Sequence, residues 1–275
     1  MARADARVFV YEGTLRDRCV HLAFTVSVRT AGGGMLGWIL VTGVVVQAGE
    51  LSNVFARHVD DAGRVAYDAA STDAELEAVV SALSTAEEPA GRAEKMAFWI
   101  NAYNVLTVDL VADHWPLESI RDLDGGNPWD KRLFTVAGQT VTLNHIEHKI
   151  LRPMGEPRIH AAVNCASLGC PPLAGTVFTG SGLEAELTAA SRRWAESTGV
   201  RIDRTAGTVS LNKIFDWYGE DFAAGATADV PGIDGKRDAA IQFLARHLPA
   251  DDAAWLMAGG YSVTWAPYSW RVNTQ

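Results

Sequence analysis

Residues 157–173 gather the side chains in this sequence that are best suited to chemistry. In chain order these are Arg158, His160, Asn164, Cys165, Ser167 and Cys170. A cysteine becomes a strong nucleophile when a nearby base takes its proton, and a third group often orients that base. We therefore interpret Cys165, His160 and Asn164 as a candidate catalytic set. Arg158, Ser167 and Cys170 are candidate binding residues beside it.

Residues 158–164 predict a half-buried strand, because apolar residues alternate with polar or small ones along them. The alternation places His160 and Asn164 on one face and directs Cys165 to the other. The histidine and the cysteine then meet only if the chain turns at Asn164. Pro171 and Pro172 exclude a helix or strand interior, so we expect both cysteines in a turn whose backbone N–H groups could bind an oxyanion.

The two cysteines also permit readings other than thiol catalysis. A Cys165–Cys170 disulfide would contribute about 2 kcal/mol and would indicate an oxidising compartment. The polar cluster would then bind a peptide, a glycan or a small molecule without reaction. A zinc site with His148, His160 and the two cysteines is a third hypothesis, but its His-x4-Cys-x4-Cys spacing is not a common zinc motif, so no metal is assigned. Whether the protein is an enzyme stays open.

Residues 92–112 predict an amphipathic helix with a wide apolar stripe. Asn101 and Asn104 lie three residues apart on its neighbouring face, among apolar side chains. Buried amides must find hydrogen-bond partners. They therefore either bond the backbone of an adjacent loop, or orient the histidine of the site and hold a substrate.

A short helix is predicted from Asn144 to Pro153, where proline ends it. Asn144 and Glu147 have the spacing of a capping box, which would give Glu147 a structural task. His148 could reach the site from this helix or pack within the fold. We keep Glu147 and His148 as candidate binding residues.

Five segments together resemble one known family. They are FWINAYN at 98–104, IEHKILRP at 146–153, PRIHAAVNCASLGCPP at 157–172, LNKIFDWY at 211–218 and YSWRVN at 268–273. This combination is similar to the domain-of-unknown-function 547 family, from about residue 50 to the C-terminus. The resemblance implies a family without naming a reaction. Ser269 stands where that family usually carries an acidic residue.

Composition and charge exclude some functions. The formal net charge is -9 and the isoelectric point is near 5.2, and no run of Lys and Arg is present to bind nucleic acid. No glycine-rich phosphate or dinucleotide motif follows a strand and opens a helix, so we expect no cofactor. The sequence does not identify the substrate or the partners.

The N-terminal segment, residues 1–49, is expected to be an extension of the domain that follows. Its apolar run at 35–46 is too short to span a bilayer but has the length of a signal-peptide core. Export to the periplasm or outside the cell is one hypothesis, and a buried element of the fold is the other. Membrane contact is expected only through this segment, and a cytoplasmic location is not excluded.

For residues 50–275 we expect a single α+β domain, with helices packed on a small, mostly antiparallel sheet. Thiol peptidases and transglutaminases offer an analogy for such a fold. Strands are expected at 133–143, as a hairpin, and at 157–164. Further helices are predicted at 183–198, 214–218 and 239–247, with strands at 208–211 and 261–265.

Overall fold

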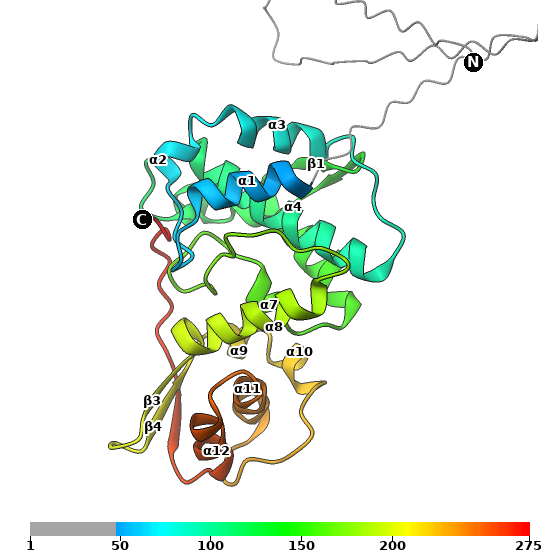
Figure 1. The fold of residues 1–275 in the computed structure, drawn as a ribbon. Helices are drawn as coiled ribbons and strands as arrows, with labels where there is room; N and C mark the ends of the chain where they lie inside the picture. The colour runs from blue at the N-terminus through cyan, green and yellow to red at the C-terminus, as the bar shows by residue number, and fades with distance from the viewer. Residues whose placement is uncertain (1–47) are drawn as a thin grey trace, which may run out of the picture. The chain divides into compact units, whose positions relative to one another are not determined.

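The structure, a computed structural model, describes residues 48–275, which belong to one compact unit (Figure 1). The longer helices are α1 (Ala48–His58), α3 (Ala74–Leu83), α4 (Arg92–Ala112), α8 (Leu183–Trp194), α11 (Gly235–Ala245) and α12 (Ala250–Ala258). The short α-helices are α2 (Tyr67–Ala70), α5 (Pro128–Lys131), α6 (Leu143–His145), α7 (Ile159–Ala162), α9 (Ile214–Trp217) and α10 (Gly219–Ala223). Two small sheets accompany them, so the predicted α+β class is confirmed.

Short 3-10 and π-helices connect these elements. The 3-10 helices are η1 (Ile120–Asp122), η2 (Asp124–Gly126) and η4 (Arg152–Met154), and the π-helices are η3 (Ile146–Leu151) and η5 (Ala195–Gly199). In the sequence, η3 follows α6 directly and η5 follows α8 directly. A π-turn adds a residue to a helical turn and is often found at functional sites.

The sheets are formed by five short strands. The strands β1 (Phe134–Val136) and β2 (Gln139–Val141) make the predicted antiparallel hairpin. In the second sheet β4 (Thr208–Leu211) lies between β3 (Val200–Asp203), which is antiparallel to it, and β5 (Ser262–Trp265), which is parallel. Most of the pairing is therefore antiparallel, as predicted, although β3 was not foreseen.

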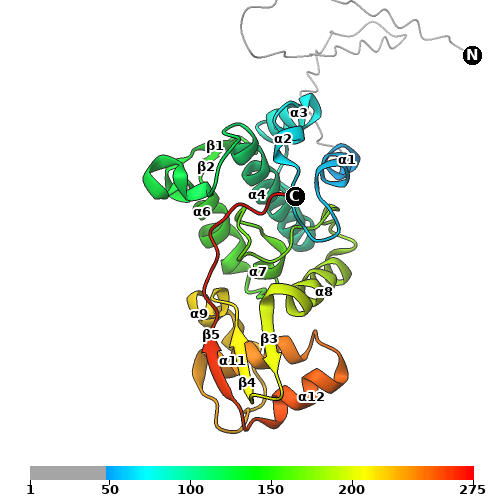
Figure 2. The same cartoon turned by 90° about the vertical axis from the view of Figure 1, so that its left-hand side faces the viewer.

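The C-terminal segment connects the two ends of this unit. After β5 the chain runs back from the three-stranded sheet to end beside α2 (Figures 1 and 2). Thr274 forms a bridge with Val65, and the Tyr67 hydroxyl donates to the Asn273 side chain at 2.8 Å. Residues 268–273 lie against the turn that holds the cysteines, because the N–H groups of Leu168 and Gly169 bond the carbonyls of Arg271 and Ser269.

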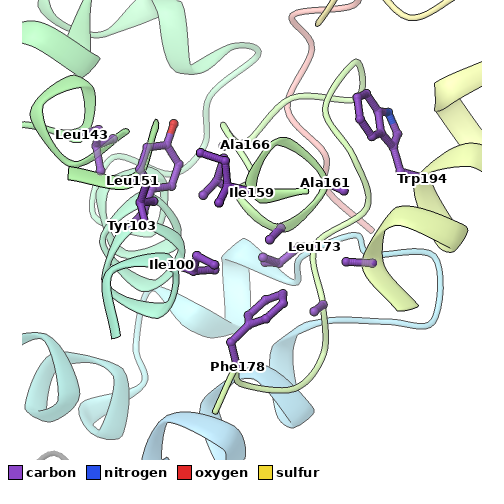
Figure 3. Close-up of a cluster of buried hydrophobic side chains, with 14 of the residues drawn as sticks. Ile100, Tyr103, Leu143, Leu151, Ile159, Ala161, Ala166, Leu173, Phe178 and Trp194 are labelled. Carbon is purple, nitrogen blue, oxygen red and sulfur yellow. The ribbon is translucent and has the colours of Figure 1, made fainter. Parts of the chain in front are cut away.

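The hydrophobic core joins α4 to the segments around the candidate site (Figure 3). Ile100 and Tyr103 from α4 pack with Leu143, Leu151 and Ile159, and all five side chains are buried. Each large apolar side chain that is fully buried contributes about 1.5–3 kcal/mol. The elements that carry the candidate residues are thus anchored by apolar packing.

The predicted strand at 157–164 is wrong, because Ile159–Ala162 form the helix α7. All four residues of α7 are buried, so burial does not alternate along them. So short a run of alternating residues does not separate a strand from a buried helical turn, and the Ala161–Ala162 pair favours helix. The assignment of His160 and Asn164 to one strand face fails with it.

Two other expectations need correction. The capping box of Asn144 and Glu147 is absent, because Thr142 caps this helix by accepting from the His145 N–H at 3.0 Å. Asn144 instead donates to Asp130 at 2.6 Å. The helix predicted at 239–247 is α11, which begins earlier and ends at Ala245, and a further helix that was not predicted, α12, follows it.

The expected N-terminal signal segment at 35–46 lies outside the described residues. Within residues 48–275, no helix is long and apolar enough to cross a membrane.

Candidate functional site

A cavity of about 230 Å³ lies where α4, η3, α7, α9 and the C-terminal segment meet. Its walls are largely aromatic, and its polar lining comes mainly from Asn144, Glu147 and His160. The lining residues are Tyr103, Trp129, Asn144, Glu147, His160, Val163, Cys165, Cys170, Ile214, Trp217, Tyr218, Tyr268 and Trp270. The cavity thus brings together four of the predicted site residues, namely Glu147, His160, Cys165 and Cys170.

Cys165 and Cys170 form a disulfide, with their sulfur atoms 2.02 Å apart. Cys170 is buried and Cys165 is half-buried. Asn164 organises the turn that connects them, since it donates to the Pro171 carbonyl at 2.8 Å and accepts from the Ala166 N–H at 2.8 Å. Asn164 therefore bonds backbone groups of the turn, and no hydrogen bond joins it to His160 within residues 48–275.

Most backbone N–H groups of this turn bond within the protein, which does not favour the expected oxyanion site. The N–H of Ala166 bonds Asn164, those of Leu168 and Gly169 bond carbonyls of Arg271 and Ser269, and that of Cys170 bonds Ser167. The Cys165 N–H donates to the Cys170 sulfur at 3.0 Å. Most of these donors are used to hold the turn, so they are not free for a ligand.

A carboxylate orients His160 within the wall of the cavity. The His160 side chain is 1% exposed, and its Nε2 atom lies 2.7 Å from Asp221 Oδ2. Arg152 binds both carboxylate oxygens of Asp221, at 2.6 and 2.9 Å. Burial pushes the pKa of Asp221 up, but hydrogen bonds from His160 and Arg152 outweigh it and hold that pKa well below its usual range. Asp221 is thus a stable anion that fixes the imidazole.

Tyr268 lies on the C-terminal segment, and its side chain contacts both sulfur atoms of the disulfide. Its hydroxyl lies 3.1 Å from Cys165 Sγ, 3.2 Å from Cys170 Sγ and 2.8 Å from the Ser167 hydroxyl. Burial raises the pKa of Tyr268 well above its ordinary value, so the phenol keeps its proton at neutral pH. It is an O–H donor placed beside the sulfur atoms.

Glu147 places a negative charge in the cavity wall. The residue is 6% exposed and lies on the π-helix η3. Burial and the charge of Glu147 raise the pKa of Tyr103 and of Tyr218 well above their ordinary values. Both phenols are therefore neutral neighbours of this carboxylate.

Four aromatic rings of the lining form a continuous wall. The Trp270 ring lies 4.6 Å from Tyr268, 5.6 Å from Trp129 and 5.8 Å from Trp217, between ring centres. Trp217 is 44% exposed, whereas Ile214 and Phe215 of the same helix are buried. We call Trp129, Trp217, Tyr268 and Trp270 the aromatic wall.

The two helix asparagines bind backbone, one of the two roles considered for them. Asn101 bonds both backbone groups of Phe178, at 2.8 and 2.9 Å. Asn104 donates to the Ala162 carbonyl and accepts from the Asn164 N–H, both at 2.9 Å. Asn104 thus ties the end of α7 to the cysteine turn, whereas Asn101 supports a loop elsewhere.

The remaining candidates lie outside the cavity lining. Arg158 pairs with Glu156 at 2.7 Å and with Glu184 at 2.9 Å. The His148 Nδ1 atom lies 2.8 Å from Arg152, which connects this ring to the Asp221 group rather than to the sulfur atoms. Ser167 is buried and reaches the site through its hydroxyl contacts with Tyr268 and Cys165. Ser269 also lies outside the lining.

Residues 48–275 contain no group of three or more His, Cys, Asp or Glu side chains that could hold a metal ion. The two cysteines of the zinc hypothesis are bonded to each other. The zinc hypothesis therefore has no ligand set in the described part of the chain.

No local motif marked Asp221, Arg152, Tyr268 or the tryptophans of the aromatic wall as site residues. Arg152, Trp217, Tyr268 and Trp270 lie in segments that support the family resemblance, which was a usable signal. Asp221 lies just after such a segment, in α10. Nothing in its own surroundings marks it as the partner of a histidine that lies 61 positions earlier.

Residues 88–194 match the model of a family described as "Protein of unknown function, DUF547". This confirms the predicted resemblance over that range. Comparison with curated proteins and with solved structures finds no match. The matched range contains His160 and both cysteines and ends before Asp221 and Tyr268.

Proposed function

We propose that this protein is a thiol-dependent hydrolase or acyl transferase, with Cys165 as nucleophile and His160 as base. One observation carries the proposal: His160, held by Asp221 at 2.7 Å, lines the same cavity as Cys165. A cysteine, a histidine and an orienting carboxylate are the parts of an activated thiol site. A cavity that only binds apolar ligands has no need of a buried histidine fixed by a carboxylate.

The proposed reaction begins with transfer of the Cys165 proton to His160. Because Nε2 donates to Asp221, the other ring nitrogen, Nδ1, is the one available to accept this proton. The sulfur attacks the acyl carbon, the bond to the leaving group breaks, and the leaving group takes the proton from His160. Water or an acceptor then cleaves the thioester and restores the thiol. Contact between Cys165 Sγ and Nδ1 in the reduced protein is the geometric requirement.

The Tyr268 hydroxyl supplies a hydrogen-bond donor for an oxyanion, a role that the backbone of the cysteine turn does not fill. This hydroxyl, 3.1 Å from Cys165 Sγ, is close enough to bond an oxyanion that forms on the attacked carbon. Since burial keeps this phenol protonated, it can donate throughout the neutral range. We assign Tyr268 this role in the proposed reaction.

The disulfide is the resting form in this proposal, and an external thiol must reduce it. Cys165 is half-buried and Cys170 is buried, so an incoming thiolate reaches the Cys165 sulfur more easily. Its attack forms a mixed disulfide and releases Cys170 as a thiolate. A second thiol then attacks the mixed disulfide and releases Cys165.

A second candidate function is a non-enzymatic binding module. The closed disulfide and the aromatic wall favour it, because neither needs chemistry to explain it. The ligand would be a peptide, a glycan or a small molecule that stacks on the rings. Export to an oxidising compartment would keep the disulfide closed, and N-terminal sequencing of the mature protein tests that location.

Acetylation by p-nitrophenyl acetate separates the two functions. Two variants are compared in a Cys19→Ala background, so that each has one thiol: Cys170→Ala, which retains Cys165, and Cys165→Ala, which retains Cys170. The thiol proposal predicts rapid acetylation of Cys165, with release of p-nitrophenol, and little reaction of Cys170. Equal, slow reaction of both, as for unactivated cysteine, would favour the binding module.

A further inference from the structure

We propose that the ligand of this cavity carries an organic cation, an alkylammonium group, held between Glu147 and the aromatic wall. This ligand would be the substrate class of the same cavity, so the inference rests on the proposed function. Binding alone can test it, without any thiol reaction.

The first observation is the charge of Glu147. The residue is 94% buried, since 6% of its surface is exposed, and it lines the cavity. Among residues 48–275 no Lys, Arg or His nitrogen lies within 4.0 Å of its carboxylate oxygens. The neutral phenols of Tyr103 and Tyr218 hydrogen-bond to this carboxylate, but they bring no positive charge, so its desolvation cost is offset only in part.

Two basic residues near the cavity, Arg152 and His160, both bond another carboxylate, that of Asp221. Arg152 binds both oxygens of Asp221 and contacts His148. His160 bonds the same carboxylate. Arg152 and Asp221 pair with each other, and Glu147 is the one acidic residue among the described residues that line the cavity, so it brings a negative charge there. A cationic group in the cavity would compensate it.

The second, independent observation is the aromatic wall. Trp217, Tyr268 and Trp270 lie with their ring centres 4.6–5.8 Å apart, and all three line the cavity. Tryptophan and tyrosine faces attract cations, most strongly where water is excluded. The Arg121 guanidinium already lies 5.1 Å from the centre of Trp270, so a positive group can approach this ring.

The wall and the carboxylate act on the same space. The charge of Glu147 raises the pKa of Tyr268, a member of the wall, in addition to the effect of burial. A ligand in contact with the wall is therefore within the field of the carboxylate. An anionic ligand would be repelled, and a neutral apolar ligand would leave Glu147 buried without a counter-charge.

The size of the cavity limits how much of the ligand it holds. Its volume of about 230 Å³ is below the usual range of roughly 300–1,000 Å³ for sites that enclose a drug-sized molecule. It suits a head group or a single side chain. We infer that a substituted ammonium head or an amine-bearing side chain enters, while the rest of the ligand stays outside.

The test compares cations with neutral molecules of the same shape on the oxidised wild-type protein. Choline is paired with 3,3-dimethyl-1-butanol, and butylammonium with 1-butanol, with tryptophan fluorescence and calorimetry as readouts. At least one cation is expected to bind about tenfold tighter than its neutral partner, a difference of about 1.4 kcal/mol. Equal affinity within both pairs would overturn the inference.

Two variants assign the preference to the cavity. Glu147→Gln keeps the shape and removes the charge, so it should abolish the preference, whereas the exposed Glu87→Gln control should retain it. Trp270→Leu should weaken binding of the cation more than binding of its neutral partner. This variant assigns the cation preference to the cavity if Glu147→Gln does not fold. A preference that persists in folded Glu147→Gln, or that Trp270→Leu leaves unchanged, would also overturn the inference.

The outcome is independent of the thiol proposal. Cation binding without acetylation of Cys165 would support a binding module for ammonium ligands. Acetylation without a cation preference would support the thiol site and reject the ammonium ligand.

Discussion

The Nε2 atom of His160 lies 2.7 Å from Oδ2 of Asp221, although 61 positions separate the two residues in the chain. The histidine comes from α7 and the carboxylate from α10. The Tyr218 ring stacks on the imidazole with ring centres 4.3 Å apart and so packs against the flat face of the imidazole. The imidazole is thus held in one orientation by a hydrogen bond and by packing.

Asp221→Asn should destabilise the protein at neutral pH and much less in acid. The folded-state pKa of Asp221 is depressed by its bonds to His160 and Arg152, so the carboxylate stabilises the fold above its unfolded pKa of about 4 and this contribution is lost as pH falls further. Urea unfolding of both proteins between pH 3 and pH 7 checks this. A stability difference that is the same at every pH would contradict it.

The effect of Asp109→Asn on protein stability should have the opposite pH dependence. Burial, with smaller effects of Asp113 and Glu77, raises the pKa of Asp109 to about 7. The folded protein therefore holds a proton that the unfolded chain releases above about pH 4, and wild-type stability falls as pH rises from 4 through 7.

The Asp109→Asn variant should melt several degrees above wild type at pH 8 and close to it at pH 4, by calorimetry. The exposed Asp68→Asn variant serves as control and should follow wild type at both values. A variant that is less stable than wild type at pH 8 would show that the Asp109 carboxyl is not a source of destabilisation.

Reduction of the Cys165–Cys170 disulfide should lower the free energy of unfolding by about 2 kcal/mol, because the closed loop is short. Urea melts with and without dithiothreitol measure the difference. The Cys165→Ser/Cys170→Ser double variant should show no response to the reductant. No change in wild type would mean that the bond is absent from the purified protein or that it does not stabilise the fold.

Gly169→Ala should displace Tyr268 from the sulfur atoms. A Cβ atom at position 169 would lie 2.7 Å from the Tyr268 ring, which is too close for any real contact. In the Cys19→Ala/Cys170→Ala background, acetylation of Cys165 should fall by about tenfold or more, since the proposed oxyanion donor moves away.

Gly175→Ala is the matched control for Gly169→Ala, because its Cβ would meet nothing closer than 3.7 Å. It should leave the acetylation rate unchanged. Equal rates in both variants would remove Tyr268 from the proposed reaction.

Long, strongly amphipathic elements could be predicted from the sequence. The apolar stripe at 92–112 gave α4 with its bounds, and the alternating runs around Ala137–Gly138 gave the β1–β2 hairpin. In both cases the local pattern and the tertiary packing favour the same structure. The short helix α7 was not predicted. Its residues are buried on every side, so apolar and polar residues do not alternate along it with a helical period.

The site could be predicted only where its residues are close in sequence. Cys165, Cys170 and His160 lie in one stretch, so their residue types alone marked them. Asp221 reaches His160 through the folding of α10, and Tyr268 reaches the cavity through the C-terminal segment, which bonds the cysteine turn. Such contacts arise from long-range packing that no local spacing encodes.

The most direct test of the thiol proposal is the pH dependence of Cys165 alkylation by iodoacetamide. The Cys19→Ala/Cys170→Ala protein is compared with the same protein carrying His160→Gln. The proposal predicts that Cys165 reacts well below pH 8.5, the ordinary pKa of a cysteine thiol, and that His160→Gln shifts its profile up to about that value. A profile centred near pH 8.5 in both proteins would contradict the claim that His160 activates Cys165.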